Sequence, residues 1–501
     1  MSRFDLSASA SWRAPLRRAL LGWWQVAQGQ PERGLVCANL GDGFHLHAWD
    51  VTSRTLRQKT HGLRPVVQGA ISADGQVVYA LIPDEQGGAE GLGRYRRLSW
   101  EGGLNPGRDL APQLSPYISF YIDECASGRL LGFMALNEGG FQMFVLDSQA
   151  GGAPHLRYEG GDFALGPFLS YDGEVSLVAV GLGEEAERGF ALEAYDTRTG
   201  ALLHRLSEGE GLLPVGFASR PHDMRFLAYD AAGVAWWNAR TGELRRLNIG
   251  LDSPLVPLDW SNDATRLLLR QDGPDGAALW LCRLADGQLS PLSSAPQGHY
   301  ERAVLTSHGT ILAEHQDAAT PPRLLELDDS TGSVQRLALA LDDEPPAHPE
   351  PAPLARLLLS ESLWGRPGRY HGLGLALRAA GLALGRLSTP EVSAGLPTFA
   401  LALGDSVLET VERAATLNLR GLILVDPSAR LLRLDVGALA WLGPVLILQA
   451  EDDLQRPPLP LGGLLARWPS ALLQHYAAHD PRRPAQEAIV AALLRFVDRA
   501  L

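Results

Sequence analysis

The first 340 residues alternate short apolar runs with polar turns, and one unit of this kind recurs along them. In each unit a strand-like run leads into a short turn that ends near a glycine, and a second strand-like run follows. Residues 195–200 read Tyr-Asp-Thr-Arg-Thr-Gly and residues 237–242 read Trp-Asn-Ala-Arg-Thr-Gly, which are the clearest copies. Alternating apolar and polar positions, with many aromatic residues, favour strands over helices.

The units are regularly spaced. The second residue of the turn falls at positions 50, 99, 147, 196, 238, 283 and 328, at intervals of 42 to 49 residues. A second set of turns lies between them, such as Ser-Ala-Asp-Gly at 72–75, where Asp-Gly tolerates the positive φ of a tight hairpin. A β-sandwich has no reason for a repeat of this length, whereas propeller blades have one. The pattern predicts a seven-bladed β-propeller over residues 25–340, after an N-terminal segment 1–24; six or eight blades are alternatives.

A proline-rich acidic segment, residues 341–353, interrupts every periodicity and is typical of a stiff linker. Beyond it, in residues 354–501, strand-like and helix-like patterns alternate, which indicates a mostly parallel sheet. Strands are predicted at 354–360, 396–403, 421–427, 444–449 and 471–476, and helices at 370–381, 407–417 and 485–501. We therefore expect a multidomain chain, an all-β propeller followed by a small α/β domain.

Composition excludes several classes of function. The net charge of −13 argues against a nucleic-acid partner, which needs a basic face. The three cysteines lie far apart, which excludes a disulfide framework and a cysteine zinc site and suits a reducing cytoplasm. No apolar run approaches the roughly 18 residues of a membrane span. We expect a cytoplasmic protein without a membrane segment.

No cofactor or metal is expected. His45, His47 and His61 have no carboxylate at a spacing that would complete a metal-ligand set. The glycine-rich segments at 87–88 and 102–103 are typical of hairpin turns rather than of phosphate-binding loops.

Three segments of the C-terminal region resemble the α/β-hydrolase fold. A strand running into Gly-Asp-Ser at 404–406, then a helix, resembles the nucleophile elbow. The segment 444–453, Pro-Val-Leu-Ile-Leu-Gln-Ala-Glu-Asp-Asp, is similar to the strand that leads to the catalytic acid, and 476–480, Tyr-Ala-Ala-His-Asp, to the catalytic-histidine loop. With a propeller upstream, the chain resembles the prolyl oligopeptidase family of serine peptidases.

The resemblance implies a catalytic triad. Matched by position, Ser406 is the nucleophile, Asp453 the acid and His479 the base, in the chain order expected for this fold. Such a trio is needed because a serine attacks only when an imidazole removes its proton and a carboxylate orients that imidazole. The backbone N–H groups of Val407 and Gly365 are the corresponding oxyanion donors.

The sequence also departs from the family. Leu408 stands where the elbow has its last glycine, and residues 363–368 read Leu-Trp-Gly-Arg-Pro-Gly instead of a His-Gly-Gly-Pro loop. Two functions follow. The first is a serine hydrolase of peptidase type, whose propeller restricts access to short peptides or small esters. The second is a catalytically inactive relative that acts as a propeller-based binding or scaffold protein. An esterase or thioesterase with a dispensable propeller is a third hypothesis, and the oligomeric state is left open.

The linker yields a first prediction. Limited proteolysis should cut the native chain first within residues 341–354, because exposed, proline-rich connections between domains are preferred sites of nicking. The fragments would be identified by mass spectrometry. Dominant cleavage inside residues 400–440 would contradict the predicted boundary.

Overall fold

The computed structural model describes most of the chain. The described residues are 3–7, 10–13, 20–40, 44–61, 66, 68–84, 92–137, 140–149, 152–183, 188–206, 211–247, 249, 255–273, 276–316, 322–328, 333–337, 351–360, 373–387, 396–404, 406–428, 431–432, 443–450, 459–476 and 485–501. They fall into two compact units, one formed by Leu20–His315 and Arg323–Leu341, the other by Met1–Ala19, Gln316–Pro322 and Asp342–Leu501.

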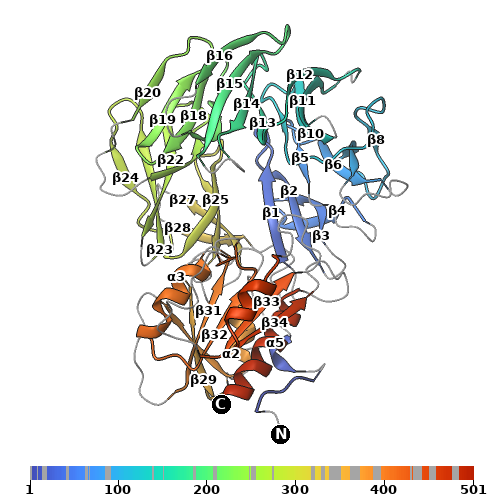
Figure 1. Cartoon of the computed structure of the whole chain (residues 1–501). Helices are drawn as coiled ribbons and strands as arrows, with labels where there is room; N and C mark the ends of the chain where they lie inside the picture. The colour runs from blue at the N-terminus through green and yellow to red at the C-terminus, as the bar shows by residue number, and fades with distance from the viewer. Residues whose placement is uncertain are drawn as a thin grey trace. The chain divides into compact units, whose positions relative to one another are not determined.

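The first unit is a β-propeller of seven four-stranded antiparallel sheets, counted over the described strands (Figure 1). Each blade uses four strands that are consecutive in the chain. The blades are β1 (Leu20–Val26), β2 (Arg33–Asn39), β3 (Phe44–Asp50), β4 (Thr55–Gln58); β5 (Gly69–Ile71), β6 (Val77–Pro83), β7 (Gly93–Ser99), β8 (Arg108–Asp109); β9 (Ile122–Glu124), β10 (Leu130–Asn137), β11 (Gly140–Asp147), β12 (His155–Gly160); β13 (Ala164–Leu169), β14 (Val175–Gly181), β15 (Phe190–Asp196), β16 (Leu202–Leu206); β17 (Leu213–Phe217), β18 (Arg225–Asp230), β19 (Gly233–Asn238), β20 (Leu244–Arg246); β21 (Leu255–Trp260), β22 (Arg266–Gly273), β23 (Gly276–Arg283), β24 (Leu289–Pro291); and β25 (His299–Leu305), β26 (Ile311–Gln316), β27 (Arg323–Asp328), β28 (Ser333–Leu337). The seven-bladed propeller predicted from the repeat is confirmed.

The recurring turn connects the third and fourth strands of each blade. Its second residue is the last residue of the third strand in every blade, from Asp50 at the end of β3 to Asp328 at the end of β27. In the fourth blade the Asp196 carboxylate accepts the backbone N–H of Thr199 at 2.7 Å, and Gly200 closes the turn at φ +74°. The Asp196 carboxylate therefore supplies an acceptor for a backbone N–H of the turn, and the turn leads to the fourth strand of the blade.

The first strands of successive blades contact one another in chain order, so they surround the axis of the ring. A side-chain acceptor joins three of these pairs across the blade boundary, each time to a residue 46 positions further on. Gln25 accepts from the Ile71 N–H at 3.2 Å, Asp123 accepts from that of Leu169 at 3.1 Å, and Asp259 accepts from that of Leu305 at 2.8 Å.

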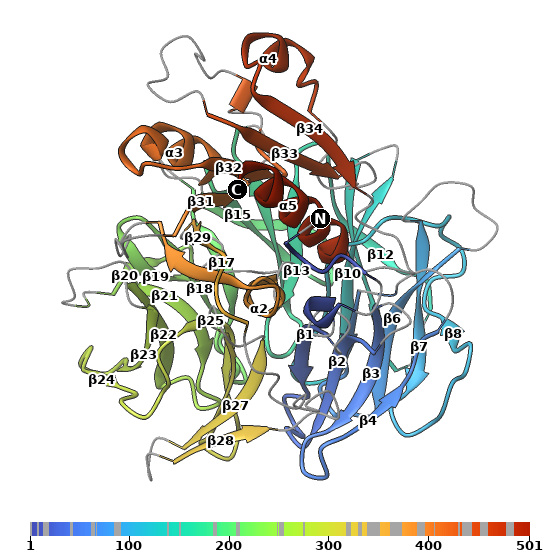
Figure 2. The same cartoon turned by 90° about the horizontal axis from the view of Figure 1, so that it is seen from below.

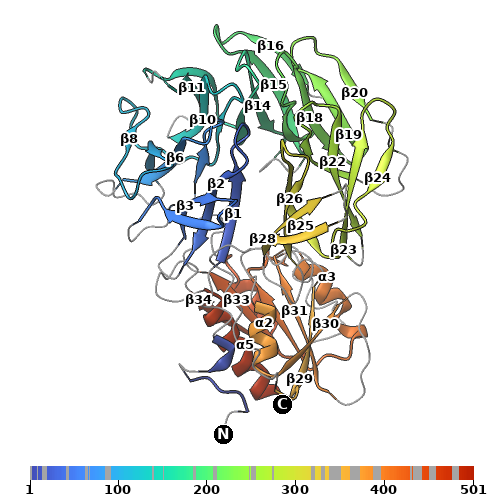
Figure 3. The same ribbon diagram turned by 180° about the vertical axis from the view of Figure 1, so that it is seen from behind.

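Hydrophobic clusters in the described residues fill all seven blade boundaries, each cluster drawing on two neighbouring blades. The closing boundary lies between the last blade, β25–β28, and the first, β1–β4, whose strands can be followed in Figure 3. There Leu312 and Leu324 pack against Trp24 and Trp49. No strand is exchanged there between the described parts of the two blades. Side-chain burial therefore closes the ring.

The boundary between the first and second blades also contains cation–π contacts and ion pairs. The guanidinium groups of Arg33 and Arg57 lie 4.6 and 4.4 Å from the ring of Trp100, and both pair with Glu101 at 2.9 and 3.0 Å. Lys59, the single lysine of the chain, is buried beside them and donates to the Trp100 carbonyl at 3.0 Å and to a second backbone carbonyl. Burial lowers the pKa of Lys59. The aromatic ring and the paired charges together join the first two blades.

The second unit holds a six-stranded sheet in its described part, in the order β30-β29-β31-β32-β33-β34, and every pairing is parallel. Its elements are β29 (Ala355–Leu359), α2 (Leu373–Ala379), β30 (Leu382–Arg386), β31 (Thr398–Leu403), α3 (Ser406–Arg413), the 3₁₀ turn η4 (Ala414–Thr416), β32 (Gly421–Val425), β33 (Val445–Ala450), α4 (Gly462–Arg467), β34 (Ala471–Tyr476) and α5 (Ala485–Ala500). Sequence patterns predicted all of these except β30 and α4, which are only five and six residues long.

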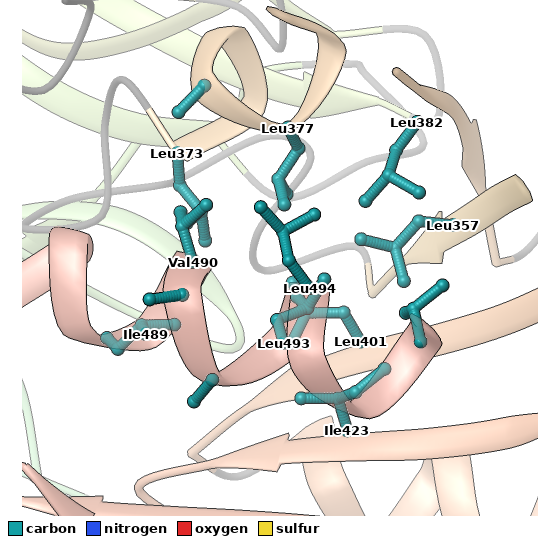
Figure 4. Close-up of a cluster of buried hydrophobic side chains, with 14 of the residues drawn as sticks. Leu357, Leu373, Leu377, Leu382, Leu401, Ile423, Ile489, Val490, Leu493 and Leu494 are labelled. Carbon is teal, nitrogen blue, oxygen red and sulfur yellow. The ribbon is translucent and has the colours of Figure 1, made fainter. Parts of the chain in front are cut away.

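Both faces of this sheet are covered. On one face α2 and α5 pack through Leu377 and Leu494 onto Leu357 and Leu401 (Figure 4). On the other face α3 and α4 pack through Val411 and other apolar residues. Burial on both faces explains why the strands read as continuous apolar runs rather than as alternating ones.

The N-terminal segment packs against this second unit's core rather than ending free. Trp12 is 1% exposed within the cluster that contains α5, and its indole N–H donates to the Asp5 carbonyl at 2.7 Å. Arg13 pairs with the buried Glu487 of α5 at 2.5 Å. Figure 2 shows the N-terminal end of the chain beside α5. The two ends of the chain therefore stabilise one core.

Asp123 gives the second prediction. Desolvation raises its pKa to about 7, partly offset by the Leu169 N–H, while the nearby Glu124 adds to the rise. An acid whose pKa is raised by folding contributes stability below pH ~4 that is lost as the pH rises through about 7. Asp123→Asn keeps an acceptor for Leu169 and removes the charge. We expect it to raise the free energy of unfolding by about 1–2 kcal/mol at pH 8, and by much less at pH 5.

Thermal unfolding at the two pH values measures this difference. Asp50→Asn is the control, because the pKa of Asp50 is lowered by the Ser53 N–H and the group stays charged from pH 5 to 8. An Asp123→Asn effect that is equal at both pH values would contradict the prediction.

Candidate active site

Parallel strands bring their carboxyl ends to one edge of a sheet, and polar side chains gather at this edge here. They follow a strand within three positions or lie in its last two positions: Ser360, Ser406, Asp426, Gln449 and Tyr476. Open parallel sheets bind their ligands at this edge. The edge is therefore the candidate site of the second unit.

Ser406 is the first residue of α3, two residues after Gly404, which has φ +52°. Its hydroxyl donates to the Leu403 carbonyl at 2.7 Å and accepts from the Leu403 N–H at 3.3 Å. In a nucleophile elbow the serine itself occupies the strained turn. Here Gly404 takes the left-handed conformation and Ser406 has an ordinary φ.

The helix after Ser406 packs closely despite the leucine in place of glycine. Val407 and Val411 are 1% and 3% exposed and face the sheet, and α3 contacts β31 and β32. Leu408 is half-buried at the side of this interface. The backbone N–H of Val407, expected as an oxyanion donor, donates weakly to the Gly404 carbonyl at 3.4 Å.

A buried carboxylate ties three strand ends together. Asp426, 6% exposed, directly follows β32 and has φ +43°, a conformation that non-glycine residues seldom adopt. Its carboxylate accepts the backbone N–H of Ala450 at 2.9 Å and the hydroxyl of Tyr476. Its own N–H donates to the Leu448 carbonyl at 2.8 Å. We call Asp426 and Tyr476 the carboxylate clamp, because they join β32, β33 and β34.

The sequence pattern predicts strand ends at the two clamp residues but indicates no role for them. The signal was present, since a parallel sheet brings Asp426 and Tyr476 to the same edge once the strand order is known. Gln449 lies beside the clamp on β33; it is 4% exposed, and its side-chain carbonyl has no hydrogen-bond partner in the part of the chain that the structure describes. Such an acceptor is available to an N–H donor.

Three of the expected site residues, Gly365, Asp453 and His479, lie outside the described residues, so their triad and oxyanion roles stay predictions. Across the described residues, no group of three or more His, Cys, Asp or Glu side chains is arranged to hold a metal ion. None of the described helices is both long and apolar enough to cross a membrane.

Comparison with known proteins shows the fold. No protein-family model matches the sequence, and no curated protein sequence matches it. An acylaminoacyl peptidase in complex with Z-Gly-Gly-Phe-chloromethyl ketone superposes with a TM-score of 0.67 at 9% identity, over 98% of this chain and 97% of that one. The Pyrococcus horikoshii acylaminoacyl peptidase gives 0.66 at 10% identity, over 99% and 97%. Prolyl oligopeptidase B from Galerina marginata gives 0.65 at 11% identity, over 98% and 89%.

These neighbours share the architecture over nearly the whole chain. At sequence identities this low, the likeness shows the fold alone. The resemblance inferred from sequence is thus confirmed for the propeller and for the class of structural neighbours, which are peptidases.

The carboxylate clamp gives the third prediction. Tyr476→Phe removes the donor to a buried carboxylate oxygen, which should lower the free energy of unfolding by about 1–3 kcal/mol. It should also speed the exchange of the Ala450 amide hydrogen, read by mass spectrometry on peptides from β33. Thr416→Ala, which deletes an exposed hydroxyl bonded to the Arg413 carbonyl, is the control. Unchanged exchange in Tyr476→Phe would mean that the clamp does not hold the strand ends.

Proposed function

We propose that the second unit is a reduced α/β-hydrolase domain and that the protein is a serine hydrolase of peptidase type. Its nucleophile is Ser406, its base His479 and its acid Asp453. The observation that carries the proposal is positional. The three residues follow β31, β33 and β34, each by three positions, in a sheet whose strands are all parallel. The segments that follow parallel strands begin at one edge of the sheet, which is where a triad in the order Ser, Asp, His assembles in this fold.

The chemistry assigned to each residue follows from its type. The Ser406 hydroxyl attacks a peptide or ester carbonyl after His479 removes its proton. Asp453 holds the imidazole in the reactive tautomer and stabilises its cationic form, and His479 then protonates the leaving group. Rotation about the Cα–Cβ bond of Ser406 must first release its hydroxyl from the Leu403 carbonyl. In this proposal the substrate replaces that contact.

The tetrahedral intermediate needs donors for its oxyanion. The Val407 N–H supports this role because it lies at the start of α3 and its contact to Gly404 is long, at 3.4 Å. Gly365 is proposed as the second donor, from the segment after β29. A single donor is worth about 3–4 kcal/mol in such reactions, so a weak oxyanion site would give a slow enzyme rather than none.

The substrate class rests on the comparisons. The similar structures are peptidases, and one carries a chloromethyl ketone derived from Gly-Gly-Phe. We propose peptides or small esters as substrates on that basis. That the propeller restricts their size stays a prediction.

A second candidate function is favoured by the local geometry of Ser406. Its hydroxyl is held by both backbone groups of Leu403, and Gly404 rather than the serine takes the strained turn. If this arrangement persists with substrate present, Ser406 closes the turn and the chain is a non-catalytic relative that binds partners through its propeller.

Covalent labelling separates the two functions and is the fourth prediction. A fluorophosphonate probe should label the native chain at Ser406, identified by peptide mass spectrometry, because only an activated serine attacks phosphorus rapidly. Ser406→Ala should abolish the label, and His479→Ala should slow it by about 10³-fold or more. Ser428→Ala, a serine whose backbone N–H bonds to the Gly404 carbonyl at the same edge, should leave it unchanged.

The folded state of each variant would be checked by thermal unfolding. A folded native chain that takes up no label would sink the hydrolase proposal and support the non-catalytic one.

A further inference from the structure

The strand β34 forms one end of the parallel sheet of the second unit, and β30 forms the other end (Figure 3). On its inner side β34 pairs with β33, residue by residue from Ala471 to Tyr476. Within the described part of the chain, no strand pairs with its outer side. An edge strand of this kind presents a row of backbone N–H and C=O groups to whatever lies beside it.

Proteins protect such edges, most often with charged side chains or with proline. Every outermost strand of the seven blades contains an arginine or a proline, as Arg57 in β4 and Pro291 in β24 illustrate. At the opposite end of the second sheet, β30 contains Arg386. In contrast, β34 reads Ala-Leu-Leu-Gln-His-Tyr, with no arginine, lysine, aspartate, glutamate or proline. Among the outer edges that the structure describes, β34 therefore lacks the protection that the others have.

The side chains of β34 also leave apolar surface accessible. Leu472 is 46% exposed, and it is the one exposed large apolar side chain in the described strands of this sheet. It lies on the same face as Tyr476, which belongs to the cluster under α5. His475 is exposed on the opposite face, where Leu473 packs toward α3 and α4. A strand added beside β34 would therefore cover exposed side chains on both faces of the sheet.

Charge favours one kind of partner for this edge. The chain has a net charge of −13, so two copies repel each other over most of their surfaces. The edge strand carries none of this charge. The helix α4, which contacts β34, has Arg467 as its one charged residue. Two copies of the chain can therefore meet at this edge without opposing acidic groups.

We propose that β34 pairs with β34 of a second copy of the chain, antiparallel and about a two-fold axis. The two six-stranded sheets then form one continuous sheet. Identical strands are self-complementary in this arrangement, because each copy offers the other the same row of donors and acceptors. Leu472 of each copy loses exposed surface to the strand beside it. This association neither uses nor requires the hydrolase chemistry.

The size of the edge sets the expected strength of the dimer. Pairing of six residues buries less than the roughly 800 Å² per partner of a standard interface. We therefore expect a dimer that dissociates on dilution. Sedimentation velocity of the full chain between about 1 and about 100 μM should show a shift from the mass of one chain to twice that mass.

A charge placed on the edge should weaken the dimer. Leu472→Lys should raise the dissociation constant at least about tenfold, because a lysine on an edge strand opposes pairing with another strand. The side chain is half exposed, so the variant should melt near the temperature of its parent. Leu202→Lys is the matched control. Leu202 is 53% exposed on β16, an edge strand that already contains Arg205, and its substitution should leave the dimer unchanged.

Single cysteines locate the two-fold axis. Antiparallel pairing places a residue of β34 opposite its own copy, at a Cα–Cα distance of about 4.5–5.5 Å that suits a disulfide. Oxidation should therefore cross-link two chains in at least one of Leu472→Cys, Leu473→Cys and Gln474→Cys. The three native cysteines are buried, so the parent chain should not cross-link and serves as the control.

Several results would overturn the proposal. A chain that stays monomeric at about 100 μM has no such association. A dimer that Leu472→Lys leaves as strong as its parent, or one that none of the three cysteines cross-links, has its interface elsewhere. All of these measurements are made without substrate. They are independent of fluorophosphonate labelling at Ser406, so failure here and failure of the hydrolase proposal are distinguishable.

Discussion

The propeller depends on burying both faces of every blade between two neighbours. A twisted four-stranded sheet with two apolar faces cannot be stable alone, and each of the seven boundaries supplies a cluster that covers one face of each neighbour. The boundary between the last and first blades is the critical one, since β1 begins the propeller and β28 ends it, so these two blades are not consecutive in the chain. There Trp24 and Trp49 are fully buried against leucines of the last blade, and burial of such large side chains is what keeps the ring closed.

The polar interior follows from the same packing. Apolar side chains on each blade face the boundaries, so the residues left toward the axis need not be apolar. Polar acceptors lie at three of the blade junctions: Gln25, Asp123 and Asp259 each accept a backbone N–H from the first strand of the next blade. The two carboxylates do this in an environment that raises their pKa to about 7. Asp123 and Asp259 therefore both join neighbouring blades and have a raised pKa.

In the second unit, the direction of the strands decides where chemistry can occur. All six described strands are parallel, so every loop that follows a strand begins at the same edge. Asp426 and Tyr476 fix the ends of three strands there with buried hydrogen bonds. The two functions considered for this edge differ in one local feature, the Ser406 hydroxyl. It is bonded to Leu403, and whether substrate can take its place separates a nucleophile from a turn residue.

Much of this architecture could be read from the sequence by itself. The spacing of turn residues such as Asp50 and Asp196 determined the blades, because a hairpin needs its capping side chain at a fixed place relative to the strand. Apolar runs likewise revealed the buried strands of the second unit. The sequence also put Ser406 three residues after a strand. It could not reveal β30 and α4, which are short and held mainly by tertiary contacts.

Other features were decided only by the tertiary structure. The packing of Trp12 against α5, the clamp between Asp426 and Tyr476, and the placing of Arg302 beside Trp24 all join residues far apart in the chain. Local periodicity carries no information about such pairs, because hydrophobic burial and hydrogen-bond satisfaction select them only after the strands are ordered in space. The sequence determined which segments are strands and where they turn; the folded chain decided which side chains meet.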